Sequence, residues 1–212
     1  MPFLRLVLAV ALAVATFSPL AAEPVRIVAL GDSLTAGYGL GPGLGFVPRL
    51  EAALREKGID AVVVDAGVSG DTTSGGLARL DWSVGPDADA VIVELGANDM
   101  LRGLDPATTE RNLDAIVGRL RARGLPVLIA GMRAAPNLGE DFGRAFNALY
   151  PAVAARHGAA LYPFFLDGVA GDPSLNLADG MHPTAEGIDV IVGRMLPHVE
   201  ALVAAAREDD PT

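Results

Sequence analysis

The chain has 212 residues, of which 51% are hydrophobic and 20% are charged, a composition typical of one globular domain with a full core. Its formal net charge is −10 and its one lysine is Lys57, which argues against nucleic acid or an anionic membrane surface as a partner. Cysteine is absent and only three histidines occur. Disulfides, a thiolate nucleophile and a cysteine-based metal site are therefore excluded, a histidine-rich metal site is not expected, and we predict no metal or other cofactor.

The first 22 residues have the three-part layout of a secretory signal peptide. Arg5 precedes an unbroken apolar run at residues 6–15, and small residues end the segment at Ala22, where we expect cleavage. The run is too short to cross a bilayer comfortably, because a span needs about 20 apolar residues. We therefore expect a signal peptide at 1–22, a mature domain at 23–212 and a periplasmic or secreted protein without a stable membrane anchor. An uncleaved signal anchor is the alternative.

Strand-like and helix-like segments alternate along the mature chain. Near-continuous apolar runs predict five strands, at residues 25–30, 59–65, 89–95, 126–131 and 159–163. Amphipathic patterns and capping residues predict helices at 46–57, at 71–80, at 105–123, at 137–153 with a capping box of Asn137 and Glu140, and from Pro183 onward. This alternation predicts one three-layer α/β/α domain with a mostly parallel sheet.

Polar segments follow the first three predicted strands, at the end where α/β sheets place their chemistry. These segments are Gly31-Asp32-Ser33-Leu34, residues 67–71 (GVSGD) and residues 96–99 (GAND). A fourth segment, Asp179-Gly180-Met181-His182, lies between the last predicted strand and the last helix. Because the carboxyl ends of parallel strands meet at one edge of a sheet, we expect all four segments to converge on one site.

The four segments contain the parts of a nucleophilic hydrolase. Ser33 is the expected nucleophile and His182 the expected general base, since an imidazole titrates near neutrality and can take the proton of a serine. Asp179 can accept from the other ring nitrogen and orient the imidazole. The backbone N–H groups of Ser33 and Gly70 and the side-chain amide of Asn98 can donate to a developing oxyanion.

Each segment also has an ordinary structural interpretation. Asp32-Ser33 and Ser69-Gly70-Asp71 could cap a turn or a helix, Asn98-Asp99 could form an Asx turn, and His182-Pro183 could start a helix. All four interpretations would have to hold together, at equivalent strand ends, for the site to be absent, so we favour the hydrolase. Asp32 itself is expected to be structural, with its carboxylate bonded to backbone in the turn.

The four blocks, in this order, are similar to those of the SGNH (GDSL-type) hydrolases, a family named after Ser, Gly, Asn and His. The resemblance covers essentially the whole mature chain. Within the family it is closest to small bacterial periplasmic esterases described as thioesterase I, lysophospholipase and arylesterase. It implies a flavodoxin-like fold, a triad of Ser33, His182 and Asp179, and an oxyanion hole made by Ser33, Gly70 and Asn98.

The expected activity is hydrolysis of acyl esters through an acyl-serine intermediate, with a lysophospholipid, an aryl or other carboxylic ester, or an acyl thioester as the small-molecule partner. Leu101, Leu104 and Leu138 could line an apolar groove for the acyl chain, although they could equally be ordinary contacts at helix starts. A carbohydrate O-acetylesterase with the same four blocks is one alternative, and a non-catalytic binding module is another. A monomer is expected.

Overall fold

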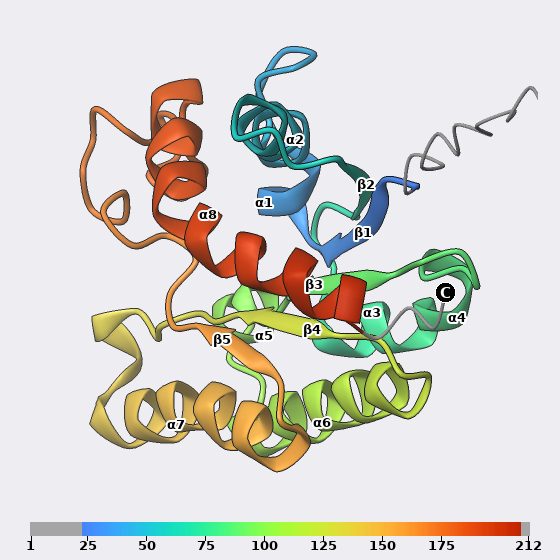
Figure 1. Ribbon diagram of the computed structural model, residues 1–212. Coiled ribbons are helices and arrows are strands. Elements are labelled where there is room, and N and C mark those ends of the chain that lie inside the picture. The colour runs from blue at the N-terminus through green and yellow to red at the C-terminus, as the bar shows by residue number, and fades with distance from the viewer. Residues whose placement is uncertain (1–22, 209–212) are drawn as a thin grey trace, which may run out of the picture.

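The computed structural model of the protein describes residues 23–208, so the predicted signal peptide lies outside the described residues. Within them, five strands form one sheet (Figure 1): β1 (Val25–Gly31), β2 (Ala61–Gly67), β3 (Ala90–Glu94), β4 (Val127–Ala130) and β5 (Ala160–Tyr162). Every neighbouring pair is parallel and the spatial order is β2-β1-β3-β4-β5. The predicted parallel five-stranded sheet is thereby confirmed.

Helices cover both faces of this sheet. They are α1 (Ser33–Ala36), α2 (Phe46–Glu56), α3 (Thr73–Ala78), α4 (Leu80–Ser83), α5 (Ala97–Leu101), α6 (Pro106–Ala122), the 3₁₀ helix η1 (Pro136–Leu138), α7 (Glu140–His157) and α8 (Ala185–Glu208). The helices α2 and α8 pack together on one face, and α6 packs against α3 and α7 on the other (Figure 1). The fold is therefore the predicted three-layer α/β/α architecture.

Burial explains why the strands are continuous apolar runs. Every residue of β3 and β4 is buried, because helices cover these central strands on both sides. At the edge of the sheet, β2 alternates instead, and Val62 is 37% exposed. The helix α8 buries one stripe of side chains at helical spacing, which includes Ile188, Ile191, Met195 and Val199.

The strand order places a topological switch point between β1 and β3. The chain leaves β1 toward β2 on one side and then returns to β3 on the other, so the connections after β1 and β3 diverge. Crevices of this kind, at the carboxyl ends of the strands, are where open α/β sheets bind ligands. Ser33 directly follows β1 and Asn98 follows β3, so both residues border the crevice.

Three local details of the chain differ from the sequence predictions. The capping box of Asn137 and Glu140 is wrong: Asn137 lies inside η1 and Gly139 is the N-cap of α7 without a side-chain bond. The last helix begins at Ala185 rather than at Pro183, and the Thr184 hydroxyl accepts from Gly187 N at 3.2 Å. The predicted helix at residues 71–80 divides into α3 and α4.

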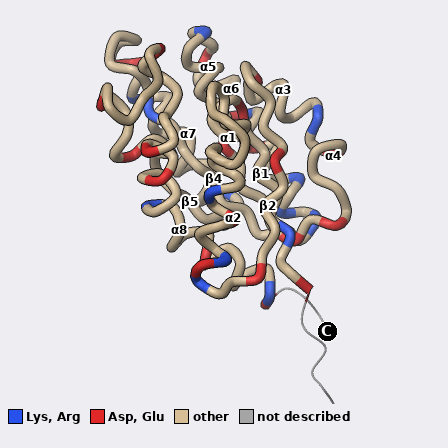
Figure 2. The backbone as a smooth tube through the Cα atoms, turned by 90° about the horizontal axis from the view of Figure 1, so that it is seen from above, with Lys and Arg blue, Asp and Glu red and all other residues tan. Residues whose placement is uncertain are grey.

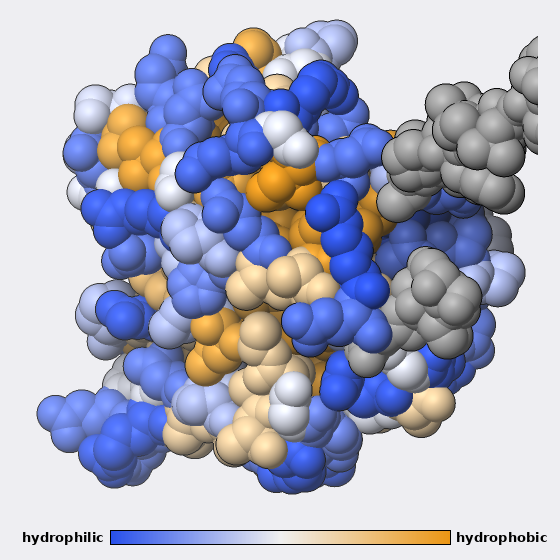
Figure 3. Space-filling view, viewed as in Figure 1, coloured by the Kyte–Doolittle hydropathy of each residue, from blue (hydrophilic) through white to orange (hydrophobic). Residues whose placement is uncertain are grey.

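The surface is mixed in charge. Acidic and basic residues are both scattered around the outside of the fold (Figure 2), and apolar residues reach the face seen in Figure 3 in patches broken by hydrophilic residues. None of the helices between residues 23 and 208 combines the length and the apolar character of a bilayer span.

Candidate active site

The turn after β1 presents Ser33 at the carboxyl edge of the sheet. Asp32 is the N-cap of α1, and its Oδ1 accepts from Leu34 N at 3.0 Å. This bond is the backbone interaction predicted for Asp32, and it starts a helix within one residue of the strand. Ser33 is the first residue of α1 and lines a large cavity, while Asp32 is fully buried.

His182 and Asp179 reach Ser33 from the long loop between β5 and α8. The distance from His182 Nε2 to Ser33 Oγ is 2.9 Å, and that from His182 Nδ1 to Asp179 Oδ2 is 2.7 Å. The structure thus brings the three predicted residues into one chain of hydrogen bonds, although Ser33 and His182 lie 149 residues apart in sequence. Such a chain leaves one ring nitrogen to act on the serine proton while the other is held by a carboxylate.

Backbone groups hold Asp179 in its charged form. Its Oδ1 accepts from Met181 N at 2.9 Å and from His182 N at 3.0 Å. These two bonds, the His182 one being the stronger cause, together with the bond to the imidazole, lower the pKa of Asp179 to about 2. The carboxylate is therefore ionised at neutral pH.

Asn176 anchors the loop that carries Asp179 and His182. Its buried side-chain amide donates to the carbonyls of Val169 and Asp172, at 2.7 and 2.8 Å. Asn176 also forms an isolated antiparallel bridge with Pro183, and Leu177 N donates to the His182 carbonyl at 2.7 Å. Sequence reasoning missed this anchor, because the amide bonds to backbone and has no sequence motif.

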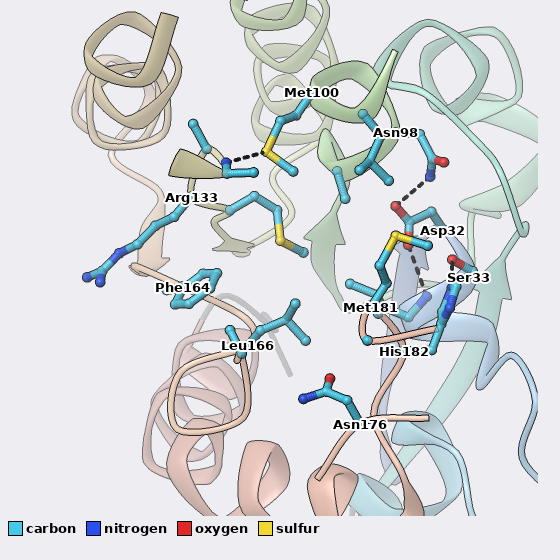
Figure 4. Close-up of a pocket in the computed structure, with 18 of the residues that line it drawn as sticks. Asp32, Ser33, Asn98, Met100, Arg133, Phe164, Leu166, Asn176, Met181 and His182 are labelled. Atoms are coloured by element: carbon cyan, nitrogen blue, oxygen red, sulfur yellow. Dashed lines mark hydrogen bonds between the residues drawn. The ribbon is translucent and has the colours of Figure 1, made fainter. Parts of the chain in front are cut away.

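Three donors predicted for an oxyanion face the same region. Ser33, Gly70 and Asn98 all line the cavity. Within residues 23–208 the N–H groups of Ser33 and Gly70 have no protein acceptor. Arg102 donates to the Gly70 carbonyl at 2.7 Å, which fixes the loop after β2. Asn98 Nδ2 donates to Asp32 Oδ2 at 2.9 Å and keeps a second N–H (Figure 4).

The cavity beside Ser33 has a volume of about 690 Å³ and a mostly apolar wall. Phe164 and Leu166 lie across it from Ser33 and His182, and Met181 lies beside His182 (Figure 4). Tyr38 packs on the imidazole, with ring centroids 4.6 Å apart. A wall of this kind suits an acyl chain, since ligand pockets are lined mainly by apolar side chains with a few polar groups.

Of the three leucines predicted to line a groove, only Leu101 lines this cavity. Leu104 follows the end of α5, where its N–H donates to the Asp99 carbonyl, and Leu138 lies half-buried within η1. The position of a residue just after a strand could not predict the cavity wall. Much of that wall comes from segments that are far from Ser33 in sequence. The apolar wall residues that sequence reasoning missed include Tyr38, Met100, Met132, Phe164, Leu166 and Met181.

The methionines give the wall an adaptable character. Met100, Met132 and Met181 all face the cavity, and unbranched thioether side chains fit ligands of different shape. Met100 is partly fixed, because its sulfur accepts from Ala135 N at 3.2 Å (Figure 4). Within residues 23–208 no group of three or more His, Asp or Glu side chains could hold a metal ion.

Comparison with known proteins agrees with this geometry. The chain matches the GDSL-like lipase/acylhydrolase family over residues 29–190. It is 40% identical to esterase TesA of Pseudomonas aeruginosa over 84% of this chain and 89% of the relative. It is 36% identical to thioesterase 1/protease 1/lysophospholipase L1 of Escherichia coli K12 over 96% of this chain and 93% of the relative.

A solved structure is also similar. AlinE4, described as an SGNH-hydrolase family esterase, superimposes with a TM-score of 0.72 and 46% identity, over 85% of this chain and 97% of AlinE4. The family match spans most of the chain, and it includes both the turn that carries Ser33 and the loop that carries Asp179 and His182. The protein therefore belongs to the GDSL-like lipase/acylhydrolase family and is a carboxylic ester hydrolase.

Proposed function

We propose that Ser33 is the nucleophile of this esterase, His182 its general base and acid, and Asp179 the residue that orients His182. The observation that carries the proposal is the unbroken chain from Ser33 Oγ through both nitrogens of His182 to Asp179, at 2.9 and 2.7 Å. This chain opens into an apolar cavity. A neutral imidazole bonded to a serine hydroxyl on one side and to a carboxylate on the other is the arrangement that activates a serine.

The reaction proceeds in two halves. Ser33 Oγ attacks the carbonyl carbon of the ester while His182 Nε2 takes the hydroxyl proton. The resulting oxyanion accepts hydrogen bonds from Ser33 N, Gly70 N and the free N–H of Asn98. When the intermediate collapses, the C–O bond to the alcohol breaks and His182 returns the proton to the leaving oxygen. A water molecule then attacks the acyl-serine with the same proton transfers in reverse, releasing the acid and free Ser33.

The cavity favours substrates with an apolar acyl chain. Its wall is apolar over most of its area and its volume exceeds what an acetyl group needs. We propose medium to long acyl esters, including lysophospholipids and aryl esters, as substrates, with acyl thioesters as a further class. The names of the relatives, an esterase and a thioesterase/lysophospholipase, support this choice and do not favour a carbohydrate O-acetylesterase.

The test is hydrolysis of p-nitrophenyl esters from acetate to palmitate by residues 23–212, with Ser33→Ala as the control. We expect a rate that depends on Ser33 and peaks at medium or long chains, and stoichiometric labelling of Ser33 by an organophosphonate. A sharp preference for acetate would overturn the substrate proposal and point to the sugar esterase. No labelling at Ser33 would overturn the catalytic assignment and favour the binding module.

We also propose that residues 1–22 are a signal peptide and that the mature domain, 23–212, acts in the periplasm or outside the cell. The charge and apolar pattern of residues 1–22 supports this proposal. Intact-mass measurement of protein recovered from the periplasm of an expressing bacterium should show a chain that begins at Glu23. Recovery of the full-length chain in the membrane fraction would instead identify an uncleaved anchor.

A further inference from the structure

A second carboxyl group lies beneath the nucleophile turn and has no part in the proposed mechanism. Glu94, the last residue of β3, is completely buried and pairs in register with Gly31 of β1. Its Oε2 accepts from the Thr35 hydroxyl at 2.8 Å and from Asp32 N at 3.3 Å. Gly31 makes room for it, because a Cβ there would lie 2.7 Å from Oε2.

Asp32 connects this buried carboxyl group to the oxyanion donors. Asp32 is also fully buried; its backbone N–H donates to Glu94 Oε2 at 3.3 Å, and the two carboxyl groups affect each other's pKa. Its Oδ2 accepts one N–H of Asn98 at 2.9 Å (Figure 4). A continuous path therefore runs from Glu94 through Asp32 to the amide that faces the cavity, across residues that come from the ends of β1 and β3.

The surroundings decide which carboxyl group holds a proton. Burial raises the pKa of Glu94 well above its usual range, and the neighbouring charge of Asp32 adds to the effect. Burial also raises the pKa of Asp32, but the bonds from Leu34 N, from Glu94 and from Asn98 oppose the increase. Two ionised carboxylates cannot share a dry site without a large cost, so the proton belongs on Glu94 and the charge on Asp32.

Hydrogen bonding supports the same assignment. Glu94 Oε1 is buried and receives no hydrogen bond from any group within residues 23–208. An ionised Glu94 would leave this oxygen unsatisfied, which is costly in a buried site. A protonated Glu94 instead accepts through one oxygen, donates through the other, and can bond to the Asp32 carboxylate.

Other titratable groups surround the pair on every side. His182 faces Asp32 from the loop before α8, and its charge would lower the pKa of Asp32. Arg79 donates to the Gly31 carbonyl at 2.9 Å from the α3–α4 junction. The Tyr150 hydroxyl, on α7, donates to the Leu95 carbonyl at 3.1 Å, and burial followed by the nearby charges raises its pKa well above its usual range. Asp99, on α5, is bonded to Thr73.

We infer that Glu94 and Asp32 share one proton and act as positioning residues for Asn98. In this arrangement neutral Glu94 holds Asp32 in place, and the Asp32 carboxylate takes one N–H of Asn98 and thereby directs the other toward the oxyanion. The inference rests on the proposed function of Asn98 as an oxyanion donor. It makes the Asp32–Asn98 bond part of the preorganisation that stabilises the transition state.

A double-mutant cycle tests the coupling between Asp32 and Asn98. Asn98→Ala should lower kcat by about 10²–10³-fold, the usual cost of one oxyanion donor, with KM little changed. Asp32→Asn should cause part of that loss in kcat, and the double variant should be no slower than Asn98→Ala alone.

Asp65→Asn is the matched control for this cycle. The Oδ1 of Asp65, like that of Asp32, accepts from the N–H two residues later (Gly67, 2.8 Å), but Asp65 lies within β2 and is exposed. The Asp65→Asn substitution should have a negligible effect on kcat, both in the wild-type protein and in the Asn98→Ala variant. Multiplicative losses for Asp32→Asn and Asn98→Ala would overturn the inference. Absence of Ser33-dependent hydrolysis in the wild type would instead refute the proposed function.

Two Glu94 variants test the shared proton. Glu94→Gln is neutral and can still donate and accept, so it should retain kcat within a few-fold. Glu94→Leu keeps a similar volume but cannot hold Asp32, so its kcat should fall as that of Asp32→Asn does. Equal losses in both variants would mean that Glu94 is ionised and would overturn the assignment.

If Glu94→Leu does not fold, infrared spectroscopy can still determine whether Glu94 is protonated. The infrared spectrum of the wild-type protein at neutral pH should contain the C=O stretching band of a protonated carboxylic acid, and that band should be missing in Glu94→Gln. A wild-type spectrum with carboxylate bands only would refute the shared proton.

Discussion

Hydrogen bonds from residues of its own loop keep the carboxylate of Asp179 ionised. Two backbone N–H groups and the imidazole nitrogen surround the carboxylate, and the two N–H groups belong to residues that follow it within three positions. The bonds that hold this carboxylate therefore come from the local sequence Asp-Gly-Met-His, while Asn176 anchors the loop itself. Tyr38, whose tilted ring packs against the imidazole, comes from the opposite end of the chain.

Replacing Asp179 tests its proposed orienting role. Asp179→Asn should lower kcat by about 10⁴-fold, because an amide favours the wrong tautomer of His182. The matched control is Asp172→Asn in the same loop, whose carboxylate accepts from Ser174 N and Oγ and does not contact His182. Steady-state kinetics of both variants checks the prediction, and equal losses would indicate a general effect on the loop.

The pH profile follows from the same contacts. Because the pKa of Asp179 is about 2, this group stays ionised while the activity changes with pH. Asp179 should therefore not contribute to the acid limb of kcat/KM, and that limb should have the slope of a single proton. A slope of two protons would show that Asp179 titrates in the same range and would contradict the prediction.

The strands and helices could be predicted from the sequence more easily than the residues at which they begin and end. Each predicted strand matches an observed strand within two residues at either end, because continuous apolar runs in covered strands give a strong local signal. The error at the start of α7 has a physical cause: the preceding residues form a 3₁₀ turn that ends in Gly139 at φ 86°, so no capping side chain is used.

The junction between β3 and α5 has no room for a side chain at Gly96. Gly96 has a φ of 117°, and an added Cβ would lie 2.3 Å from the hydroxyl of Tyr150. Gly96→Ala should therefore destabilise the fold by about 2–4 kcal/mol, through backbone strain and overpacking. Denaturant unfolding of the variant measures this loss in the free energy of unfolding.

A second substitution separates the two causes. Tyr150→Phe removes the hydroxyl and its bond to Leu95, which should cost about 1 kcal/mol by itself. In this background Gly96→Ala should cost less, because the closest atom is gone and only strain remains. Additive losses would show that the hydroxyl is not the obstacle.

Stability of the whole molecule should depend on pH in two opposite ways. Asp179 and Asp114 have lowered pKa values, so their contributions are present above the ordinary value of 3.8 and are lost as the pH falls below it. Glu94 has a raised pKa, so the fold favours its protonated form and loses stability as the pH rises through that raised value. The net charge of −10 adds self-repulsion at neutral pH.

The free energy of unfolding should therefore be greatest at mildly acidic pH and should decline toward alkaline pH. Glu94→Gln should flatten that decline, because the variant has no proton to lose. Denaturant midpoints measured across the pH range check both statements. A wild-type stability that keeps rising into the alkaline range, or an unchanged slope in Glu94→Gln, would contradict them.

The four chemistry-bearing segments and the parallel sheet could be predicted from the sequence alone. Strand periodicity, turn residues and the spacing of Asp179 and His182 are local properties, and the rule that parallel strands end at one edge brings the segments together. Ser33, His182 and Asp179 lie in these segments, so residue type and position along the chain are enough to predict them as site residues.

Only the tertiary structure decided the contacts between segments. The bond between Asp32 and Asn98 joins residues 66 apart, and that between Asp32 and Glu94 joins residues 62 apart. The cavity wall includes Leu101 but not Leu104 or Leu138. Local sequence determines which elements form and where polar residues lie along them. The burial that raises the pKa of Glu94, and the identity of its neighbours, exist only after β1 and β3 have paired.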